Sequence, residues 1–433
     1  MTMPQANRRQ FVMGSATLPL LSLPASAGAT IAASIESDLH HYVGFGNKQA
    51  GGTGDNDCGD WLASALEQAG FAIERQAVSV PWFAPDRCEI AVDGARTTLW
   101  PQPIVRLTGA DGLSGPLVRV DAAGNAAAPL KGAIALVDLP FGRWSTALAK
   151  PIRTPIEAAF AGGARAVVAV TNGPTGKIIA LNTDGRQPMF AGPVTLMAPG
   201  DAAPFFAGAM RGVRATLHLT GTSGRRPAFN FVGRIDRGKR RWLVVSTPRS
   251  GWFTCAGERG GGIAAWLHLA RWASRNAPDH NLAFVCNTGH EYEYLGAEES
   301  LKEMAPKPQE TAFWLHLGAN LAARDWHDAV GEMTPLSGTD SQRYLVVSPA
   351  LLPETRIAFA GLAGLESPYS SDRISAGELT GIIAAGYRSV AGVFGIHRFH
   401  HVAEDDARCL STKAVTETTA AFQRLVEHAL KGG

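Results

Sequence analysis

The segment that decides the fold runs from Leu282 to Ala297 and reads LAFVCNTGHEYEYLGA. Its first five residues are apolar and predict a buried strand, which leads into the adjacent pair His290 and Glu291. Open α/β sheets place their chemistry where the carboxyl ends of strands meet loops. The pair therefore predicts a metal site or an acid/base site. The alternative is a solvated pair at the end of a strand.

Around this segment, apolar strands alternate with helices from about residue 226 onward. Trp242–Ser246 is a nearly continuous apolar run, as expected for a strand inside a parallel sheet. Gly261–Ala273 is rich in Ala, Leu and Trp and predicts a helix. The alternation predicts an α/β fold with a doubly wound, mixed and mostly parallel sheet that has helices on both faces. Three further strands and a closing helix are expected at Ala312–Leu317, Tyr344–Val347, Ser389–Phe394 and Thr412–Leu430.

The sequence between residues 100 and 225 has a different pattern. Gly132–Val137 and Ala164–Val170 are predicted strands, Pro155–Gly163 is a predicted short helix, and Gly and Pro turns separate them. This part has few carboxylates and no cluster of histidines, so we find no catalytic constellation in it. We expect an N-terminal part of the α/β domain at 31–99, an inserted small β-rich domain at 100–225, and the α/β catalytic-like domain at 226–433.

The composition narrows the possible partners. The chain has 433 residues and a formal net charge of +2, so nothing argues for a nucleic-acid partner. The basic run Arg237–Arg241 lies between two apolar segments and is interpreted as a solvated turn. We expect a small-molecule or peptide-like substrate, and the oligomeric state stays open.

The first 27 residues have the pattern of a twin-arginine signal peptide. Asn7–Val12 reads NRRQFV, a short apolar run follows, and Ala25–Ala27 is a small-x-small cleavage site. We therefore expect export to the periplasm with cleavage near Ala27, unless the arginine pair is fortuitous. No other stretch approaches the roughly 18 apolar residues that a membrane span needs, so no membrane association is expected after cleavage.

The five cysteines form no CxxC pair, which argues against a zinc knuckle. Cys58 and Cys88 are candidates for a disulfide in an oxidising compartment. Cys255 and Cys286 flank the candidate site, and we expect both to be inert, small apolar side chains. Cys255 as a nucleophile stays an alternative because it lies at a glycine-rich turn.

The order of these parts resembles the zinc aminopeptidase superfamily, in the form of bacterial leucyl aminopeptidases with an inserted protease-associated domain. Glutaminyl cyclases and glutamate carboxypeptidases belong to the same superfamily. The resemblance rests on the strand–helix–strand pattern of the inserted part and on the turns that follow the α/β strands. It covers essentially the whole mature chain and implies a protease-associated-like domain at 100–225.

The resemblance also places the family's metal ligands on this sequence, position by position. Pro248 stands where the family has a histidine ligand, and Gly318 stands where it has an aspartate ligand. Glu258 falls on the acid that bridges two metals, Glu291 on a carboxylate ligand, and His401 on the final histidine. The two lost positions serve one metal and the three retained positions serve the other. The resemblance thus implies a single zinc ion held by Glu258, Glu291 and His401, with a fourth place open.

Further roles at this site follow from the same alignment for His290 and from the neighbouring residues themselves for the others. His290 takes the position of the general base, and its ordinary pKa near 6.5 suits proton transfer at neutral pH. Arg249 and Arg259 are expected to flank the mouth, where they either hold a carboxylate or oxyanion or form surface ion pairs. Asp405 is expected to orient His401. Three more histidines either replace lost ligands or are structural: His316, His397 and His400.

Two further patterns lie close to the candidate site in the sequence, and neither identifies the substrate. Gly296–Glu299 reads GAEE but lies past the end of the strand, and it is interpreted as part of a helix. Several aromatic residues near the site either line an apolar pocket or pack the loops. They are Trp252, Phe253, Tyr292, Tyr294 and Phe399.

Three functions remain open from the sequence. The first is an exported one-metal hydrolase or acyl-transfer enzyme of the zinc aminopeptidase superfamily that acts on an amide or peptide-like bond. The second is a metal-free isomerase or lyase that uses His290 and Glu291 for proton transfer. The third is a non-catalytic binding protein on the same scaffold.

Overall fold

The computed structural model describes residues 25–329 and 332–431. The predicted twin-arginine motif lies outside these residues. Within the described residues, no helix is both long enough and apolar enough to cross a bilayer.

A central sheet positions the candidate site. Its inner strands are β9 (Trp242–Pro248), β10 (Asn281–Asn287), β11 (Thr311–Leu317) and β16 (Val390–Gly395). β9 pairs in parallel with β10 and with β11, and β11 pairs in parallel with β16. β14 (Arg343–Val347) adds an antiparallel strand to β16. The sheet is therefore mixed and mostly parallel, as predicted, and each predicted strand in this part is present.

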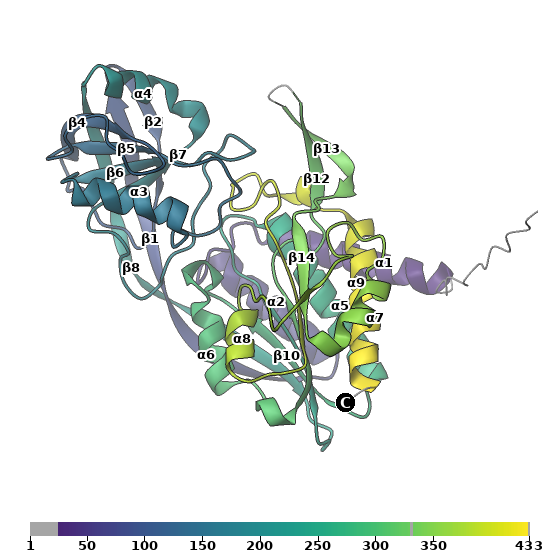
Figure 1. Cartoon of the computed structure of the whole chain (residues 1–433). Coiled ribbons are helices and arrows are strands. Elements are labelled where there is room, and N and C mark those ends of the chain that lie inside the picture. Colours follow the sequence, from purple (N-terminus) through teal and green to yellow (C-terminus); the bar gives the residue numbers. More distant parts are fainter. Residues whose placement is uncertain (1–24, 330–331, 432–433) are drawn as a thin grey trace, which may run out of the picture.

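Helices cover both faces of this sheet (Figure 1). Alternate side chains of β9 point to opposite faces, so Leu243 and Val245 join one buried cluster and Val244 joins another. The first cluster includes residues of α1 (Ala25–Gly44), α2 (Thr53–Gln68), α5 (Gly261–Asn276), α7 (Leu352–Ala358) and α9 (Thr412–Lys431). The second includes residues of α8 (Leu379–Ala384), with α6 (Leu295–Glu303) packed against it.

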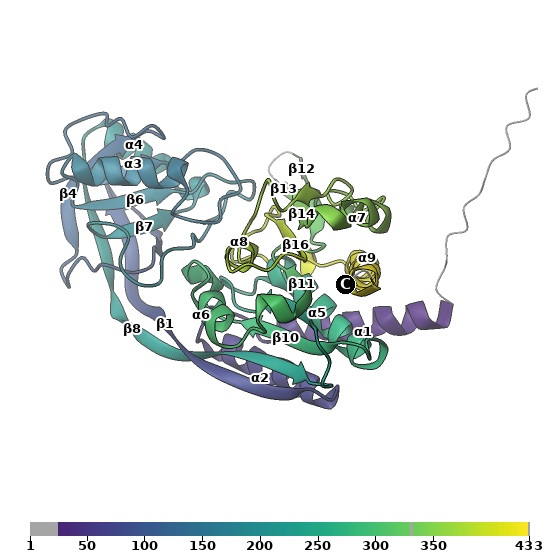
Figure 2. The same ribbon diagram turned by 60° about the horizontal axis from the view of Figure 1, so that its bottom comes forward.

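Two long strands connect the α/β part to a second lobe. β1 (Ala72–Val92) and β8 (Arg214–Ile235) pair with each other along most of their length, and β8 also pairs with β10. Figure 2 shows both strands sweeping from the α/β part into the lobe. From the sequence we expect alternating short strands after residue 70, such as Glu89–Val92, whereas the structure has one long strand, β1, that runs through Pro81 and Pro85. The pairing accommodates Pro85 through a shift of register before Arg87.

The second lobe has its own sheet and helices. β4 (Leu113–Val120), β5 (Ile134–Asp138), β6 (Ala166–Val170) and β7 (Val194–Met197) pair in parallel in that order. The predicted strands and short helix of this part are present. The domain boundaries at residues 100 and 225 remain predictions. The remaining elements of the lobe are β2 (Ala95–Thr98), β3 (Trp100–Pro101), α3 (Lys150–Ala161) and α4 (Ala203–Met210).

A small hairpin and a short edge strand complete the described strands. β12 (Arg324–Ala329) and β13 (Glu332–Thr339) form the hairpin, and β15 (Tyr369–Ser370) pairs in parallel with β14.

The candidate disulfide between Cys58 and Cys88 is not formed, because all five cysteines are free and buried. Cys58 lies on α2 in the core of the α/β part, whereas Cys88 lies on β1 in the core of the lobe. The two thiols therefore belong to different hydrophobic cores.

Candidate metal and acid/base site

A tight turn after β9 carries the first site residue. Cys255 adopts a left-handed conformation (φ 40°), and Ala256–Gly260 form a π-helical turn that leads into α5. The turn buries both Glu258 and Arg259. Gly257 is required in this turn, since a Cβ there would lie 2.8 Å from Cε1 of His397. Such π turns occur frequently at functional sites.

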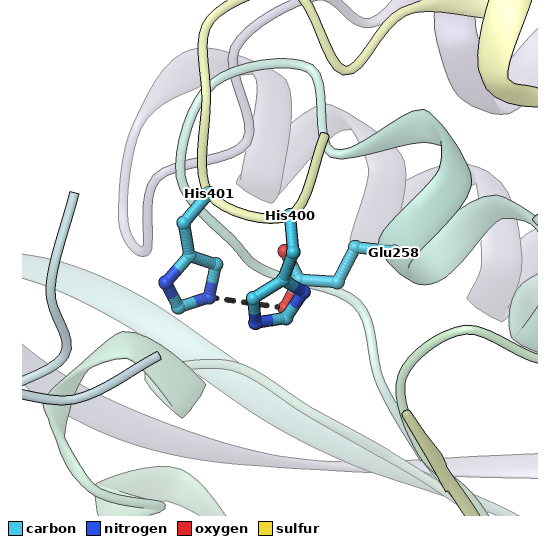
Figure 3. Close-up of side chains that lie close together, drawn as sticks. All are labelled: Glu258, His400 and His401. Atoms are coloured by element: carbon cyan, nitrogen blue, oxygen red, sulfur yellow. Dashed lines mark ion pairs between the residues drawn. The ribbon is translucent and has the colours of Figure 1, made fainter. Parts of the chain in front are cut away.

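The loop after β16 brings two histidines to Glu258. Nε2 of His401 lies 3.4 Å from Oε1 of Glu258, and the ring of His400 stacks on that of His401 with centroids 3.9 Å apart. Figure 3 shows the three side chains together. Nδ1 of His401 donates to the carbonyl of Ala180 at 2.8 Å. The second lobe thus fixes the orientation of His401 and directs its Nε2 toward Glu258.

These three residues have the character of a metal site. One ligand atom from each of Glu258, His400 and His401 lies within 4.8 Å of the others, and all three residues are buried. Three atoms of this cluster have no hydrogen-bond partner among the described residues: both carboxylate oxygens of Glu258 and Nδ1 of His400. Buried polar atoms are normally hydrogen-bonded. Oε1 of Glu258 has charged neighbours, so Oε2 of Glu258 and Nδ1 of His400 are the atoms that point to a missing partner. Two imidazoles and one carboxylate suit zinc, and the residues present fit that ion.

Arg259 is the cation closest to this cluster. Its Nη2 lies 2.6 Å from Oε1 of Glu258, and its Nε donates to the carbonyl of Ser250 at 3.2 Å. Burial alone would raise the pKa of Glu258, but the charges of Arg259 and His401 hold it well below its ordinary value. Glu258 is therefore ionised. The contact is an ion pair without hydrogen-bond geometry, so Nη1 and Nη2 of Arg259 are both left without an acceptor.

Glu291, the third predicted ligand, lies outside this cluster. Its Oε2 accepts from Oγ of Ser250 at 2.7 Å, and its Oε1 accepts from the backbone N–H of Ala50 at 2.8 Å. Burial raises the pKa of Glu291 to about 7. Both carboxylate oxygens of Glu291 thus have hydrogen-bond donors within the protein. The third possible metal ligand beside Glu258 and His401 is His400.

His290 lines a cleft of about 790 Å³, and a second pocket of about 480 Å³ lies beside it and shares Tyr294 and Gly377 with the cleft. His400 lines the same cleft as His290, together with residues of the second lobe between Phe141 and Thr146. Burial lowers the pKa of His290, so its ring is neutral near pH 7. His290 and His400 therefore face one cavity, whereas Glu258 and His401 lie behind its lining residues.

Glu378 contacts His290 and was not predicted. Its Oε1 lies 3.1 Å from Nδ1 of His290. Glu378 precedes the short helix α8, far from His290 in the sequence and outside any recognisable motif. No local signal in the sequence marks it.

The predicted positions of Arg249 and Arg259 at the mouth are both wrong, because both side chains are buried and neither lines the cleft. Nε of Arg249 lies 3.0 Å from Oδ1 of Asp55. Its Nη2 donates to the carbonyl of Phe229 at 2.7 Å. These contacts join α2 to the end of β9 and leave Arg249 without access to the cleft.

The predicted partner of Asp405 is also wrong. Its carboxylate accepts from the backbone N–H groups of Gly257 (2.7 Å) and Glu258 (3.1 Å), and it pairs with Nε2 of His397 at 3.2 Å. Asp405 therefore positions the turn that carries Glu258. His401 is oriented by a backbone carbonyl instead.

The other residues singled out in the sequence have structural contacts. Nδ1 of His316 lies 3.0 Å from Oγ of Ser246, and burial lowers the pKa of His316 to about 4. Burial raises the pKa of Cys255 to about 12, which disfavours a thiolate nucleophile. Gly318 lines the cleft, and a Cβ there would lie 2.5 Å from the carbonyl oxygen of Val393. No ligand side chain fits at that position without a shift of the backbone.

The aromatic residues divide between cleft and core. Tyr294 lines the cleft, whereas Trp252 and Tyr292 are buried and pack edge to face. Phe399 packs against Trp326. The GAEE segment lies on α6, as predicted.

Comparisons with solved structures identify the fold. No family model matches the chain, and no curated protein matches it. The peptidase M28 precursor of Shewanella amazonensis has a TM-score of 0.71 at 16% identity, over 94% of this chain and 96% of that chain. The zinc aminopeptidase BSAP of Bacillus subtilis has a TM-score of 0.70 at 17% identity, over 93% and 95%. An aminopeptidase of Aneurinibacillus sp. strain AM-1 has a TM-score of 0.64 at 16% identity, over 92% and 93%. The chain has the fold of these peptidases.

Proposed function

We propose that the chain is a hydrolase of amide or peptide-like bonds that holds one zinc ion between Glu258, His400 and His401. The observation that carries this proposal is the convergence of three buried ligand atoms, with both oxygens of Glu258 and Nδ1 of His400 lacking hydrogen-bond partners. His400 replaces Glu291 in the ligand set implied by the family resemblance. The fold and the size of the cleft are consistent with this function.

A bound zinc ion would polarise the substrate carbonyl and lower the pKa of water from 15.7 to about 7. His290 takes one proton from the attacking water as the water oxygen bonds to the carbonyl carbon. The C–N bond then breaks, and the imidazolium of His290 returns this proton to the leaving nitrogen. The products are a carboxylic acid and an amine, so the step is balanced without a further reactant.

Arg259 contributes electrostatic stabilisation in this scheme. Its guanidinium is buried beside Glu258 and has two terminal nitrogens without acceptors. A fixed cation with unused donors stabilises the negative charge that develops on the carbonyl oxygen. Arg249 has no part in the proposed mechanism, because it is enclosed by Asp55 and Phe229.

The second lobe forms part of the substrate site in this proposal. Its segment from Phe141 to Thr146 lines the cleft, and its Ala180 orients His401. We assign residues 100–225 to a protease-associated-like domain on the basis of the sequence pattern. Export to the periplasm, proposed from the twin-arginine motif, would place the cleft in contact with extracytoplasmic peptides.

One observation favours a second candidate, a metal-free isomerase or lyase. Arg259 already lies 2.6 Å from Glu258, and this cation weakens the attraction of the carboxylate for a metal ion. Without a metal ion, His290 would transfer the proton and Arg259 would stabilise the anion.

A screen of amide and peptide substrates with the full chain, with and without added zinc, tests the proposal. We expect zinc-dependent cleavage that is lost in His290→Ala and in Glu258→Gln. Zinc-independent turnover that requires His290 would favour the second candidate. A chain without turnover in either variant or wild type, but with ligand binding, would be a non-catalytic binding protein.

A further inference from the structure

Glu378 links the candidate base to the end of the neighbouring strand. Its Oε1 lies 3.1 Å from Nδ1 of His290, and its Oε2 accepts from Nδ2 of Asn287 at 3.3 Å. Asn287 is the last residue of β10, the strand that leads to His290. Glu378 is buried and ionised, since its neighbours His290 and His316 offset the effect of burial and lower its pKa. One contact on each oxygen therefore holds the carboxylate of Glu378 in place.

This contact determines which nitrogen of His290 carries the proton. A carboxylate accepts hydrogen bonds and cannot donate them, so Nδ1 of His290 must be the donor. Nε2 is then the unprotonated nitrogen of a neutral ring. Tyr294 packs edge-on against the ring at an interplanar angle of 61°, with centroids 5.0 Å apart, and restricts its rotation.

Glu378 reaches His290 from outside the main cleft. It lines a neighbouring pocket of about 480 Å³, together with Asn287 and Trp314, and it does not line the cleft of about 790 Å³. His290 lines the main cleft. The carboxylate thus holds one edge of the imidazole while leaving the cleft free for substrate.

We infer that Glu378 is the positioning residue of the acid/base pair: it holds His290 in the tautomer with a free Nε2 and stabilises the imidazolium that forms when Nε2 accepts a proton. This inference rests on the proposed function, in which His290 is the base. Glu378 acts only through His290 and does not touch the substrate.

Glu378→Gln is the informative substitution because it keeps the shape of the side chain. A glutamine amide can donate to Nδ1, which favours the opposite tautomer with the proton on Nε2. Glu378→Asp keeps the charge but shortens the side chain by one methylene. Glu299→Gln is the matched control, because Glu299 pairs with Lys302 on the surface of α6 and forms neither a hydrogen bond nor an ion pair with His290 in the part of the chain that the structure describes.

Nitrogen-15 NMR of histidine-labelled full chain measures the tautomer directly, with the His290 signals assigned by their absence in His290→Gln. We expect the Nδ1–H tautomer in the wild type and in Glu299→Gln, and its loss in Glu378→Gln. Glu378→Asp should keep the wild-type tautomer. An Nε2–H tautomer in the wild type, or an unchanged tautomer in folded Glu378→Gln, would overturn the inference.

Kinetics separate this inference from the proposed function. Removing the orienting partner of a histidine base should lower kcat by about 10²-fold or more while KM changes little, and Glu378→Asp should recover part of the loss. Activity that survives in Glu378→Gln but is lost in His290→Ala would refute the role of Glu378 alone. Activity that survives in His290→Ala would refute His290 as the base, and with it the proposed mechanism.

Discussion

Glu291 offers a quantitative test of the site, because the structure makes it a buried, hydrogen-bonded acid and not a ligand. Burial raises its pKa to about 7 from the ordinary 4.5. The hydrogen bonds from Ser250 and Ala50 favour the ionised form but do not offset burial. The folded state therefore binds the proton of Glu291 more tightly than the unfolded state does.

The sign and size of the pH effect follow from this difference. Protonated Glu291 stabilises the folded state relative to the unfolded state. This contribution to the free energy of unfolding is fully present below about pH 4.5, decreases as the pH rises, and is lost above about pH 7. At about 1.4 kcal/mol per pKa unit, the interval from 4.5 to about 7 corresponds to about 3 kcal/mol. Glu291→Gln removes the titration while keeping a carbonyl oxygen for Ala50 and an amide for Ser250.

Guanidinium unfolding of the wild type and Glu291→Gln, followed by tryptophan fluorescence from pH 4.5 to pH 8, measures the effect. The difference in unfolding free energy, wild type minus variant, should fall by about 3 kcal/mol across this range. A difference that does not change with pH would mean that Glu291 is ionised in the folded state. That result would refute the assignment and restore Glu291 as a candidate ligand.

Three further outcomes are expected. Asp55→Asn should lower the unfolding free energy by about 3–5 kcal/mol, because it leaves Arg249 buried without its counter-charge; a loss below about 1 kcal/mol would contradict this. Gly318→Ala should cost about 1–3 kcal/mol because its Cβ would crowd the carbonyl of Val393, whereas Gly338→Ala, with open space around it, should change stability by less than about 0.5 kcal/mol. A thiol assay without reductant should find five free thiols per unfolded chain and no rapidly reacting thiol in the folded chain at pH 8; three thiols would indicate a disulfide.

The strands of the α/β part were predictable because their sequence signal is local. Leu282–Cys286 is a continuous apolar run and Trp242–Ser246 a nearly continuous one, and strands covered on both faces produce such runs. The paired strands β1 and β8 were not predicted over their full length, since Pro81, Pro85 and Gly221 interrupt the pattern. Their pairing depends on contacts between segments more than 100 residues apart, and the local periodicity of the sequence carries no information about such contacts.

The candidate site was predictable only in part, for a similar reason. The resemblance aligned Glu258 and His401 with metal ligands of the family, and in the structure Nε2 of His401 lies 3.4 Å from Oε1 of Glu258. The role of Glu378 depends on a contact across 88 positions of the chain, with no motif around it. The partners of Asp405 and Arg249 are likewise set by tertiary packing, because both side chains are buried against backbone groups of other segments.

Zinc content is the most direct test of the central claim. Mass spectrometry of the full chain, purified without chelator and dialysed against zinc, should find about one zinc per chain. The metal should be lost in Glu258→Gln, His400→Ala and His401→Ala, and retained in Glu291→Gln. Absence of zinc from the wild type after dialysis, or its retention in Glu258→Gln, would contradict the proposed site.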